Sequence, residues 1–228
     1  MAEARKRRAR DPEATREVIL EAARTLLSKY GPEALSLSEV AHLAGVNRGT
    51  AYQHFETREK LIQATAAWVA DKLFREVFGD PETLEERQVE HVDVADLSDR
   101  LADFAMRNPE LCRIWLLQLL SSPAPEKDPF WREYQGSLDR FTKTDLAQPG
   151  VDSEVLSVLM LAGAFLWPIW ARSHAKNDKE REALRQRFQR ETLRISMFGT
   201  LRSEKFPAIE DRLSQEESPA PRKRVRGR

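Results

Sequence analysis

Apolar residues recur every three or four positions along most of this chain, which is the spacing of one face of an α-helix. The first such segment spans residues 12–30 and ends at Gly31-Pro32, two poor helix formers. Its apolar positions are Ile19, Ala22, Ala23, Leu26, Leu27 and Tyr30. Further helices are predicted over residues 37–44, 48–55, 58–78, 94–107, 109–120, 128–146, 153–175 and 178–201. No segment shows the strict alternation of a β-strand, so the predicted fold class is all-α.

The pattern divides the chain into two helical parts with polar ends. The expected segments are a flexible basic arm, a small helical domain, a larger helical domain and a flexible basic tail over residues 1–11, 12–60, 61–205 and 206–228. The formal net charge of +0 hides this asymmetry, because residues 61–217 carry 21 basic and 28 acidic side chains. A polyanionic partner at the basic ends fits the pattern, and so do two solvated tails that keep the protein in solution.

Composition excludes several classes of protein. A hydrophobic fraction of 41 % is enough for a core, and a single cysteine, Cys112, excludes a disulfide framework and a cysteine-built zinc site. No apolar segment follows the charged first ten residues, so no signal peptide is expected and the expected location is the cytoplasm. Residues 155–171 are uncharged, but this stretch is shorter than the ~20 residues of a membrane span. It is expected inside a bundle or a subunit interface, and no membrane partner is expected.

Residues 36–55 have the pattern of a helix-turn-helix. Ser36 precedes Glu39 by three positions, the spacing of a capping box, and Gly45 suits the left-handed conformation that ends a helix. Asn47 can cap the helix that follows. That second helix carries many hydrogen-bond donors and no acidic residue, as expected of a helix that reads base edges in the major groove. Similar packing occurs in proteins that do not bind DNA, so a helical adaptor is an alternative.

The stretch SLSEVAHLAGVNRGTAYQHFETREKLI, residues 36–62, resembles the tetracycline-repressor (TetR) family of bacterial regulators, and the likeness extends over about residues 14–65. The resemblance implies an all-helical homodimer with an N-terminal DNA-binding domain and a C-terminal domain that binds small molecules and dimerises. Two positions depart from the family. Asn47 stands where serine is usual, and both are good helix caps. Ala51 stands where a larger aliphatic residue is usual, which would let the recognition helix lie closer to the first helix.

The resemblance and the side-chain chemistry together give the expected DNA contacts: Arg48, Gly49, Thr50, Tyr52, Gln53, His54 and Lys60. Tyr52, His54 and Lys60 match family positions that contact phosphates, and Thr50 matches one near the backbone and bases. Arg48 can read guanine through two hydrogen bonds, and Gln53 can pair with adenine. Gly49 lets the two backbones approach closely. Core packing is the alternative for Tyr52 and is the expectation for Phe55.

The basic ends are expected to differ in role. Arg5, Arg7 and Arg8 precede the first helix without apolar periodicity, so they are free to enter the minor groove beside the recognition helix. Residues 222–228 are equally basic but follow the last helix of the other domain. They are therefore not expected to contact the duplex.

Aromatic side chains lie on separate predicted helices of the second domain and would line an apolar pocket in a bundle. The expected ligand contacts are Phe104, Trp115, Trp131, Phe165, Trp167 and Trp170, with ordinary core packing as the alternative for each. Few charges accompany them, which favours a small hydrophobic effector. Dimerisation is expected through the last two long helices by Val155, Leu159, Ala162, Leu166, Leu184, Phe188, Leu193, Ile195 and Phe198.

No Ser/His/Asp spacing, phosphate-binding loop or glycine-rich fingerprint is present, so no catalytic residue or cofactor is expected. His91 and Asp93 are too few to predict a metal site, and Cys112 is expected to be a buried thiol. The sequence therefore predicts a ligand-responsive transcriptional regulator, a repressor that binds a palindromic double-stranded DNA operator as a homodimer and is released by a hydrophobic effector. The alternatives are the helical adaptor and an enzyme that uses the same fold.

Overall fold

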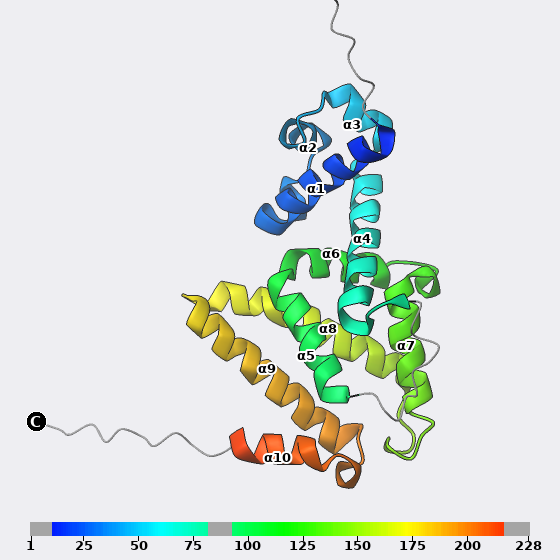
Figure 1. The fold of residues 1–228 in the computed structure, drawn as a ribbon, viewed down its shortest axis with the longest axis vertical. Helices are drawn as coiled ribbons and strands as arrows, with labels where there is room; N and C mark the ends of the chain where they lie inside the picture. The colour runs from blue at the N-terminus through cyan, green and yellow to red at the C-terminus, as the bar shows by residue number, and fades with distance from the viewer. Residues whose placement is uncertain (1–10, 82–92, 217–228) are drawn as a thin grey trace, which may run out of the picture. The chain divides into compact units, whose positions relative to one another are not determined.

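The computed structural model describes residues 11–81 and 93–216 (Figure 1). Its α-helices are α1 (Pro12–Tyr30), α2 (Leu37–Leu43), α3 (Arg48–His54), α4 (Arg58–Phe78), α5 (Val94–Arg107), α6 (Pro109–Leu120), α7 (Pro129–Phe141), α8 (Ser153–His174), α9 (Asp178–Gly199) and α10 (Pro207–Glu216). Within these ranges there is no strand, only an isolated antiparallel bridge between Ala147 and Leu201. The all-α prediction is therefore confirmed.

The described residues form two compact units. The first contains the residues up to 72 and residues 108–128, and the second contains residues 73–107 and those from 129 onward. α4 contributes to both units, and α6 belongs to the first although it follows α5 in the chain. The boundary expected between residues 60 and 61 stays a prediction.

The first unit is built around α1, which packs against α2 and α6. The Asp11 carboxylate caps α1 by accepting a hydrogen bond from the Glu13 amide at 3.1 Å, and Pro12 occupies the first turn, where its missing N–H costs nothing. Ile19, Ala23 and Leu27 are fully buried, so the predicted apolar face of this helix is its core face.

Gly31 ends α1 with a φ of 76°, a left-handed value that disfavours any side chain. A Cβ atom at this position would lie 2.9 Å from the Glu33 carboxylate and 3.4 Å from the Arg113 guanidinium. Arg113 also pairs at 2.9 Å with the buried carboxylate of Glu110 on α6. A side chain at position 31 would therefore be disfavoured by the backbone conformation, and the ends of the Glu33 and Arg113 side chains would have to move.

The second unit consists of α5, α7, α8, α9 and α10 with the end of α4. α8 packs against α5, α7 and α9, and α9 also packs against α5 and α10. Phe104, Phe130 and Phe165 are fully buried. The ring of Phe130 lies 5.5 Å from that of Phe78 and 5.6 Å from that of Tyr134, measured between ring centroids. Burial raises the pKa of the Tyr134 hydroxyl.

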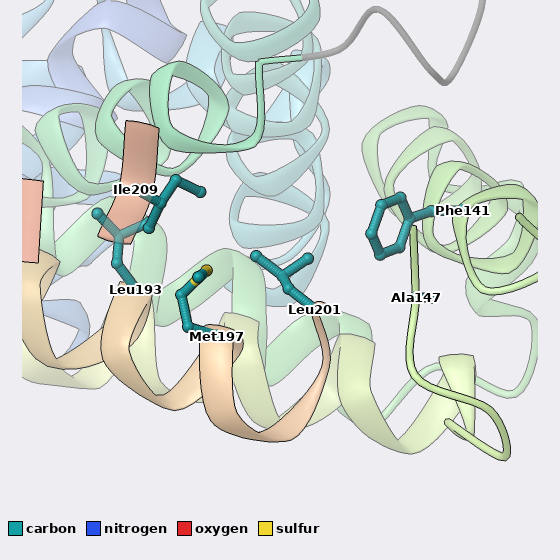
Figure 2. Packing of buried hydrophobic residues seen from close by; sticks show 6 residues of the cluster. All are labelled: Phe141, Ala147, Leu193, Met197, Leu201 and Ile209. Carbon is teal, nitrogen blue, oxygen red and sulfur yellow. The ribbon is translucent and has the colours of Figure 1, made fainter. Parts of the chain in front are cut away.

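The flexible tail expected from residue 206 is wrong for residues 207–216, which form α10. Pro207 is well placed in a first helical turn, and Ile209 is buried, with 6 % of its surface exposed. Figure 2 shows the cluster that Ile209 joins, which consists of Phe141, Ala147, Leu193, Met197, Leu201 and Ile209. The segment is short and holds two large aliphatic residues, Ile209 and Leu213, which gives too little periodicity to predict this helix. Residues 217–228 lie outside the described ranges.

Two other helical expectations need correction. The helix expected to reach residue 146 ends at Phe141, where Thr144 donates its hydroxyl hydrogen bond to the Phe141 carbonyl at 2.8 Å and stabilises a turn. Leu184 and Leu193, expected at a dimer interface, instead face the core of their own unit, with 9 % and 1 % exposed. The two positions are nine residues apart and so lie on opposite sides of an ideal α-helix, which means that the period of α9 alone does not predict that both face the core.

α8 is the one helix in the described ranges that is long and apolar enough to cross a membrane, and it continues through Pro168. About a third of its most apolar window is buried within the protein. Its outward face carries large apolar side chains, and α9 adds Ile195 and Phe198, which are 61 % and 79 % exposed. The exposed apolar residues of α8 are Val155, Leu159, Leu166 and Trp170.

Candidate DNA-binding site

The two short helices α2 and α3 begin at the caps that the sequence predicts. The Ser36 hydroxyl accepts a hydrogen bond from the Glu39 amide at 3.1 Å. The Asn47 side-chain oxygen accepts one from the Thr50 amide at 2.7 Å and another from the Thr50 hydroxyl at 3.1 Å. Between the helices Gly45 takes a φ of 62°, so the glycine permits the reversal of the chain. Both caps and the turn are confirmed.

α3 is fixed to its unit by one apolar side. Ala51 is fully buried on α3, and Val40 is fully buried on α2, against which α3 packs. Phe55 follows α3 and is 3 % exposed, with the Arg16 guanidinium 5.1 Å from its ring centroid. The core reading of Phe55 is confirmed. The side chain of Ala51 is small and is completely shielded from solvent.

The opposite side of α3 presents polar groups to solvent. Tyr52 is 40 % exposed, so it is not a core residue, and Gln53 is also exposed. The Arg48 guanidinium lies over the Tyr52 ring, 5.4 Å from its centroid, and one of its nitrogens is 3.4 Å from the Tyr52 hydroxyl. Among the described residues Arg48 has no carboxylate partner. Its donors are therefore held in position and remain available to a ligand.

The other predicted contacts lie around this face. Gly49 is exposed, and a Cβ there would lie 3.3 Å from the Asn47 side-chain oxygen that caps the helix. Thr50 and His54 are half-buried. The Thr50 hydroxyl donates its hydrogen to Asn47. Its lone pairs and the methyl group therefore remain for other contacts.

Lys60 lies in the first turn of α4, where its amide donates to the Thr57 hydroxyl at 3.2 Å. Its ammonium group is exposed and pairs with the Glu56 carboxylate at 2.5 Å. That hydrogen bond and the charge of Lys60 hold the pKa of Glu56 below its ordinary value of 4.5. A phosphate that approaches Lys60 must therefore compete with Glu56.

Sequence reasoning missed two arginines that hold this unit together. Arg58 donates to the carbonyl oxygen of Leu35 at 2.9 Å and to that of Pro32 at 2.5 Å, which links the start of α4 to the turn before α2. Arg24 is 7 % exposed, pairs with Glu17 at 2.8 Å, and places its guanidinium 4.1 Å from the ring centroid of Trp68. Both arginines occur in helices whose charged residues look like an ordinary solvated face, so no sequence signal distinguishes them.

The six aromatic residues expected to bind a ligand are divided between the two units. Trp115 belongs to the first unit, is 1 % exposed, and donates its indole hydrogen bond to the Asp128 carboxylate at 2.9 Å. The other five belong to the second unit. There Phe104 and Phe165 are fully buried and Trp131 is 8 % exposed.

Trp167 and Trp170 form a stack on α8. Their ring centroids lie 4.9 Å apart, and the Trp167 ring also stacks on Phe188 of α9 at 5.6 Å. Trp167 donates its indole hydrogen bond to the Leu184 carbonyl at 3.1 Å, and Trp170 stacks on His174 at 4.0 Å. Their role in ligand binding stays a prediction.

Several sequence predictions cannot be placed. Arg5, Arg7 and Arg8 fall outside the described residues, as does His91. Cys112 is fully buried on α6, as expected. Within the described ranges no group of three or more His, Cys, Asp or Glu residues could hold a metal ion.

The capped pair α2–α3, with a buried face and a donor-rich solvent face, defines a helix-turn-helix protein. Residues 19–65 match the family described as "Bacterial regulatory proteins, tetR family". This match shows a tetR-family segment at residues 19–65, which contain α2 and α3. The curated proteins to which the chain is similar are named as transcriptional regulators, which favours a regulator over the enzyme alternative.

The similarity to individual curated proteins covers about a quarter of the chain. The chain is 44 % identical over 50 residues to the HTH-type transcriptional regulator TtgR of Pseudomonas putida, which covers 22 % of this chain and 24 % of TtgR. It is 37 % identical over 57 residues to the HTH-type transcriptional repressor Rv3405c of Mycobacterium tuberculosis, 25 % of this chain and 30 % of that protein. The matched segment thus spans less than a third of either relative.

The fold extends the likeness over most of the chain. A γ-butyrolactone receptor described as ArpA-like superposes with a TM-score of 0.56, covering 90 % of this chain and 98 % of the receptor. The two sequences are 21 % identical over that alignment, so this likeness concerns the fold alone.

Proposed function

We propose that this protein is a transcriptional repressor that binds a palindromic DNA operator as a homodimer and is released by a small hydrophobic effector. The observation that carries the proposal is the solvent face of α3, where Arg48 and Gln53 are exposed and no acidic side chain lies on the helix. A major groove admits one α-helix, and its base edges accept the bidentate hydrogen bonds that these two side chains offer. Acidic side chains on such a face would be repelled by the phosphates.

The assignment of individual contacts follows the resemblance to the TetR family. Tyr52, His54 and Lys60 match family positions that contact phosphates, and such contacts would position the helix without specifying a sequence. The arm with Arg5, Arg7 and Arg8 would follow the minor groove. The sense of regulation, repression, is supported by the relation to Rv3405c, which is described as a repressor.

Homodimerisation is proposed through the outward faces of α8 and α9. Leu159, Ile195 and Phe198 are more than half exposed, and each would cost free energy in water. Several large apolar side chains exposed on two long helices are typical of a subunit interface. A single helix-turn-helix buries too little surface for specific binding, which also favours two copies on one operator. A cytoplasmic location follows from this function.

A hydrophobic effector is proposed because the second unit is rich in aromatic side chains and few charged residues accompany them in the sequence. The γ-butyrolactone receptor of similar fold is named for a small, weakly polar ligand. The expected contacts within the second unit remain Phe104, Trp131, Phe165, Trp167 and Trp170. Effector binding would reach the helix-turn-helix along α4, whose residues contribute to both units.

The decisive experiment is a gel-shift titration with a duplex that contains the region upstream of the protein's own gene. A sequence-specific shift that competitor DNA of random sequence does not remove is expected. The double variant Arg48→Ala/Gln53→Ala should lose the preference for that duplex while its circular dichroism spectrum is unchanged. A protein that shifts all duplexes equally, or none, would contradict the proposal and favour the helical adaptor.

Deletion of residues 1–10 tests the arm on the same operator. Each phosphate contact that is lost flattens the slope of log K against log salt concentration by ~0.9 on duplex DNA. The deletion should therefore lower the affinity and flatten this slope, whereas deletion of residues 218–228 should change neither. Equal slopes for the intact protein and the N-terminal deletion would leave the arm without a role in binding.

Substitution of Phe198 tests the dimer. Phe198→Glu should give monomers in sedimentation velocity at micromolar concentration, because the proposed interface would then have to bury a charge in place of an aromatic ring. Glu191→Gln on the same helix serves as the control for a change in charge, and it should remain dimeric. A wild-type protein that sediments as a monomer would exclude the proposed assembly.

A further inference from the structure

A hollow in the second unit is lined mainly by arginine side chains. It has a volume of about 590 Å³, within the range of small-molecule sites. Four arginines, two glutamines, one alanine and one aspartate form its wall: Asp99, Ala183, Arg185, Gln186, Arg187, Gln189, Arg190 and Arg212. None of the aromatic residues expected to bind a hydrophobic effector is among them. This wall has a surplus of positive charge, which favours an anion.

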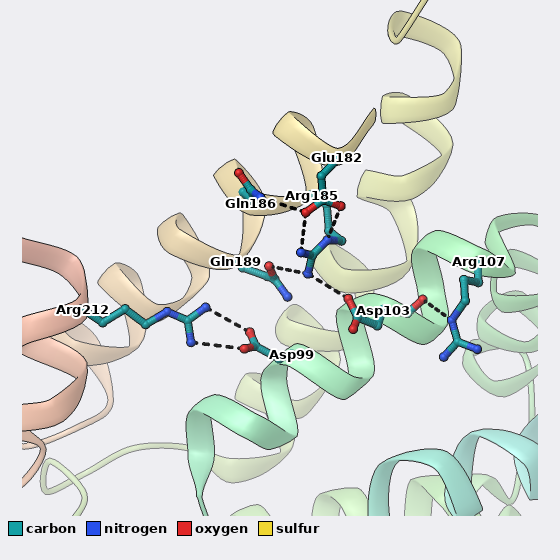
Figure 3. A network of polar contacts seen from close by, with 8 residues as sticks. All are labelled: Asp99, Asp103, Arg107, Glu182, Arg185, Gln186, Gln189 and Arg212. Atoms are coloured by element: carbon teal, nitrogen blue, oxygen red, sulfur yellow. Dashed lines mark hydrogen bonds and ion pairs between the residues drawn. The ribbon is translucent and has the colours of Figure 1, made fainter. Parts of the chain in front are cut away.

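The aspartate in the wall is already neutralised. Asp99 on α5 pairs with Arg212 of α10 through two contacts of 3.2 and 3.4 Å (Figure 3). One turn further along α5, Asp103 pairs with Arg185 of α9 at 2.8 Å. Arg187, by contrast, is exposed and has no carboxylate partner among the described residues. Arg190 lies 4.0 Å from the carboxylate of Glu191, so within the described ranges Arg187 is the arginine of this wall that meets a ligand without a carboxylate partner.

Gln189 supplies an independent observation that points to a ligand. Its side chain is 3 % exposed, and its amide oxygen accepts a hydrogen bond from Arg185 at 2.8 Å. Because a guanidinium only donates, this contact fixes which end of the amide is oxygen. The amide nitrogen Nε2 is buried and has no hydrogen-bond partner in the described part of the chain. In Figure 3 this nitrogen lies between the Arg212–Asp99 pair and the Arg185–Asp103 pair.

From this arrangement we infer that the hollow binds a small organic anion, whose carboxylate or phosphate oxygen accepts a hydrogen bond from Gln189 Nε2 and faces Arg187 and Arg190. Buried donors in proteins are almost always satisfied, and an oxyanion supplies the acceptor that Gln189 lacks. Arginine is the residue best suited to such a group because its planar fork matches carboxylate and phosphate oxygens. The buried position of Gln189 excludes a DNA duplex as the partner, since its backbone cannot enter a hollow of this size. This site goes beyond the proposed function.

Thermal unfolding in the absence of DNA tests the inference with two probes, inorganic phosphate and succinate. Each is titrated at constant ionic strength against chloride, so that general salt effects cancel. A ligand that binds the folded protein raises Tm in a saturable manner. A response to phosphate alone identifies a phosphate-bearing ligand, and a response to succinate alone identifies a carboxylate. If neither probe gives a saturable rise, the inference is overturned.

Two variants and a matched control locate the binding. Arg187→Ala should weaken the apparent affinity for the active probe about tenfold, because it removes one charged donor. Arg194→Ala changes an arginine of the same helix outside the hollow, where it pairs with Glu191, and should leave the affinity unchanged. Gln189→Leu should also weaken binding, provided that its unliganded spectrum matches wild type. Equal responses of Arg187→Ala and Arg194→Ala would overturn the inference, whatever the outcome of the operator titration.

Discussion

The helices α3 and α9 both carry arginines, but they use them in opposite ways. On α3, Arg48 contacts the ring and hydroxyl of the neighbouring Tyr52 and has no carboxylate partner within the described ranges. On α9, Arg185 binds Glu182, Asp103 and Gln189 at once, and its contacts with the carboxylates of Glu182 and Asp103 raise its pKa further above the ordinary range. An arginine with acidic partners stabilises the fold around it, whereas one without them is available to an external anion. The contrast separates the arginines that hold this protein together from those that can bind a partner.

The largest effect that follows from this contrast concerns Arg48. Arg48→Ala should lower operator affinity by about 5- to 150-fold, since a bidentate base contact is worth ~1–3 kcal/mol, and should relax the preference at one base pair of each half-site. Arg194→Ala on α9 should leave operator affinity unchanged. Fluorescence anisotropy with operator variants measures both. An Arg48→Ala protein of unaltered specificity would show that α3 does not read that base.

The reverse effect is expected for Arg185. Arg185→Ala should lower the free energy of unfolding by about 1–2 kcal/mol. The substitution removes partly exposed ion pairs and the hydrogen bond that Arg185 donates to the side-chain oxygen of Gln189. Arg48→Ala should leave the free energy of unfolding within about 0.5 kcal/mol of wild type, as for most surface substitutions. Urea denaturation measures the difference. Equal stability of the two variants would contradict the claim that Arg185 stabilises the fold and Arg48 does not.

The cap of α3 has an intermediate effect. Asn47→Ala should cost about 1 kcal/mol of stability, because the Thr50 amide and hydroxyl lose their shared acceptor. Operator affinity should fall while the preference among operator variants is kept, since no base contact is removed. Asn47→Ser provides the control, because serine also caps helices, and it should behave like wild type. A changed base preference in Asn47→Ala would assign Asn47 to the readout itself.

The smallest effect concerns Glu56. Glu56→Gln should raise DNA affinity a few-fold and steepen its salt dependence, because Lys60 no longer has to leave a carboxylate to meet a phosphate. The lowered pKa of Glu56 means that the pair is intact above pH 4.5 and is lost only as the pH falls through the lower folded-state pKa. Titration of Glu56 should therefore add no pH dependence to the DNA binding of wild type between pH 6 and 8. A Glu56→Gln protein of unchanged affinity would show that Lys60 does not bind phosphate.

The predictable parts of this structure are those in which neighbours in the sequence determine the conformation. The caps at Ser36 and Asn47, the turn at Gly45 and the helix that begins at Pro109 all depend on residues within four positions of each other. The side of α3 that faces solvent also follows from its period, which leaves Ala51 as the buried position.

The parts that could not be predicted depend on contacts between distant residues. Arg212 meets Asp99 across 113 positions, and Arg185 meets Asp103 across 82. Trp115 was expected in a ligand pocket of the second domain, yet α6 belongs to the first unit. The period of a helix shows which of its faces is apolar, but it does not show which other helix packs against that face.

The outward position of Trp170 has a practical consequence for spectroscopy. Trp170 is 44 % exposed on the apolar face of α8, whereas Trp115 and Trp131 are buried within their units. Indole emission shifts to shorter wavelength when water is removed from the ring. If α8 joins a second copy, dilution of the protein should shift its intrinsic fluorescence to the red as subunits separate, without any attached label. The chain thus carries its own optical reporter of subunit association.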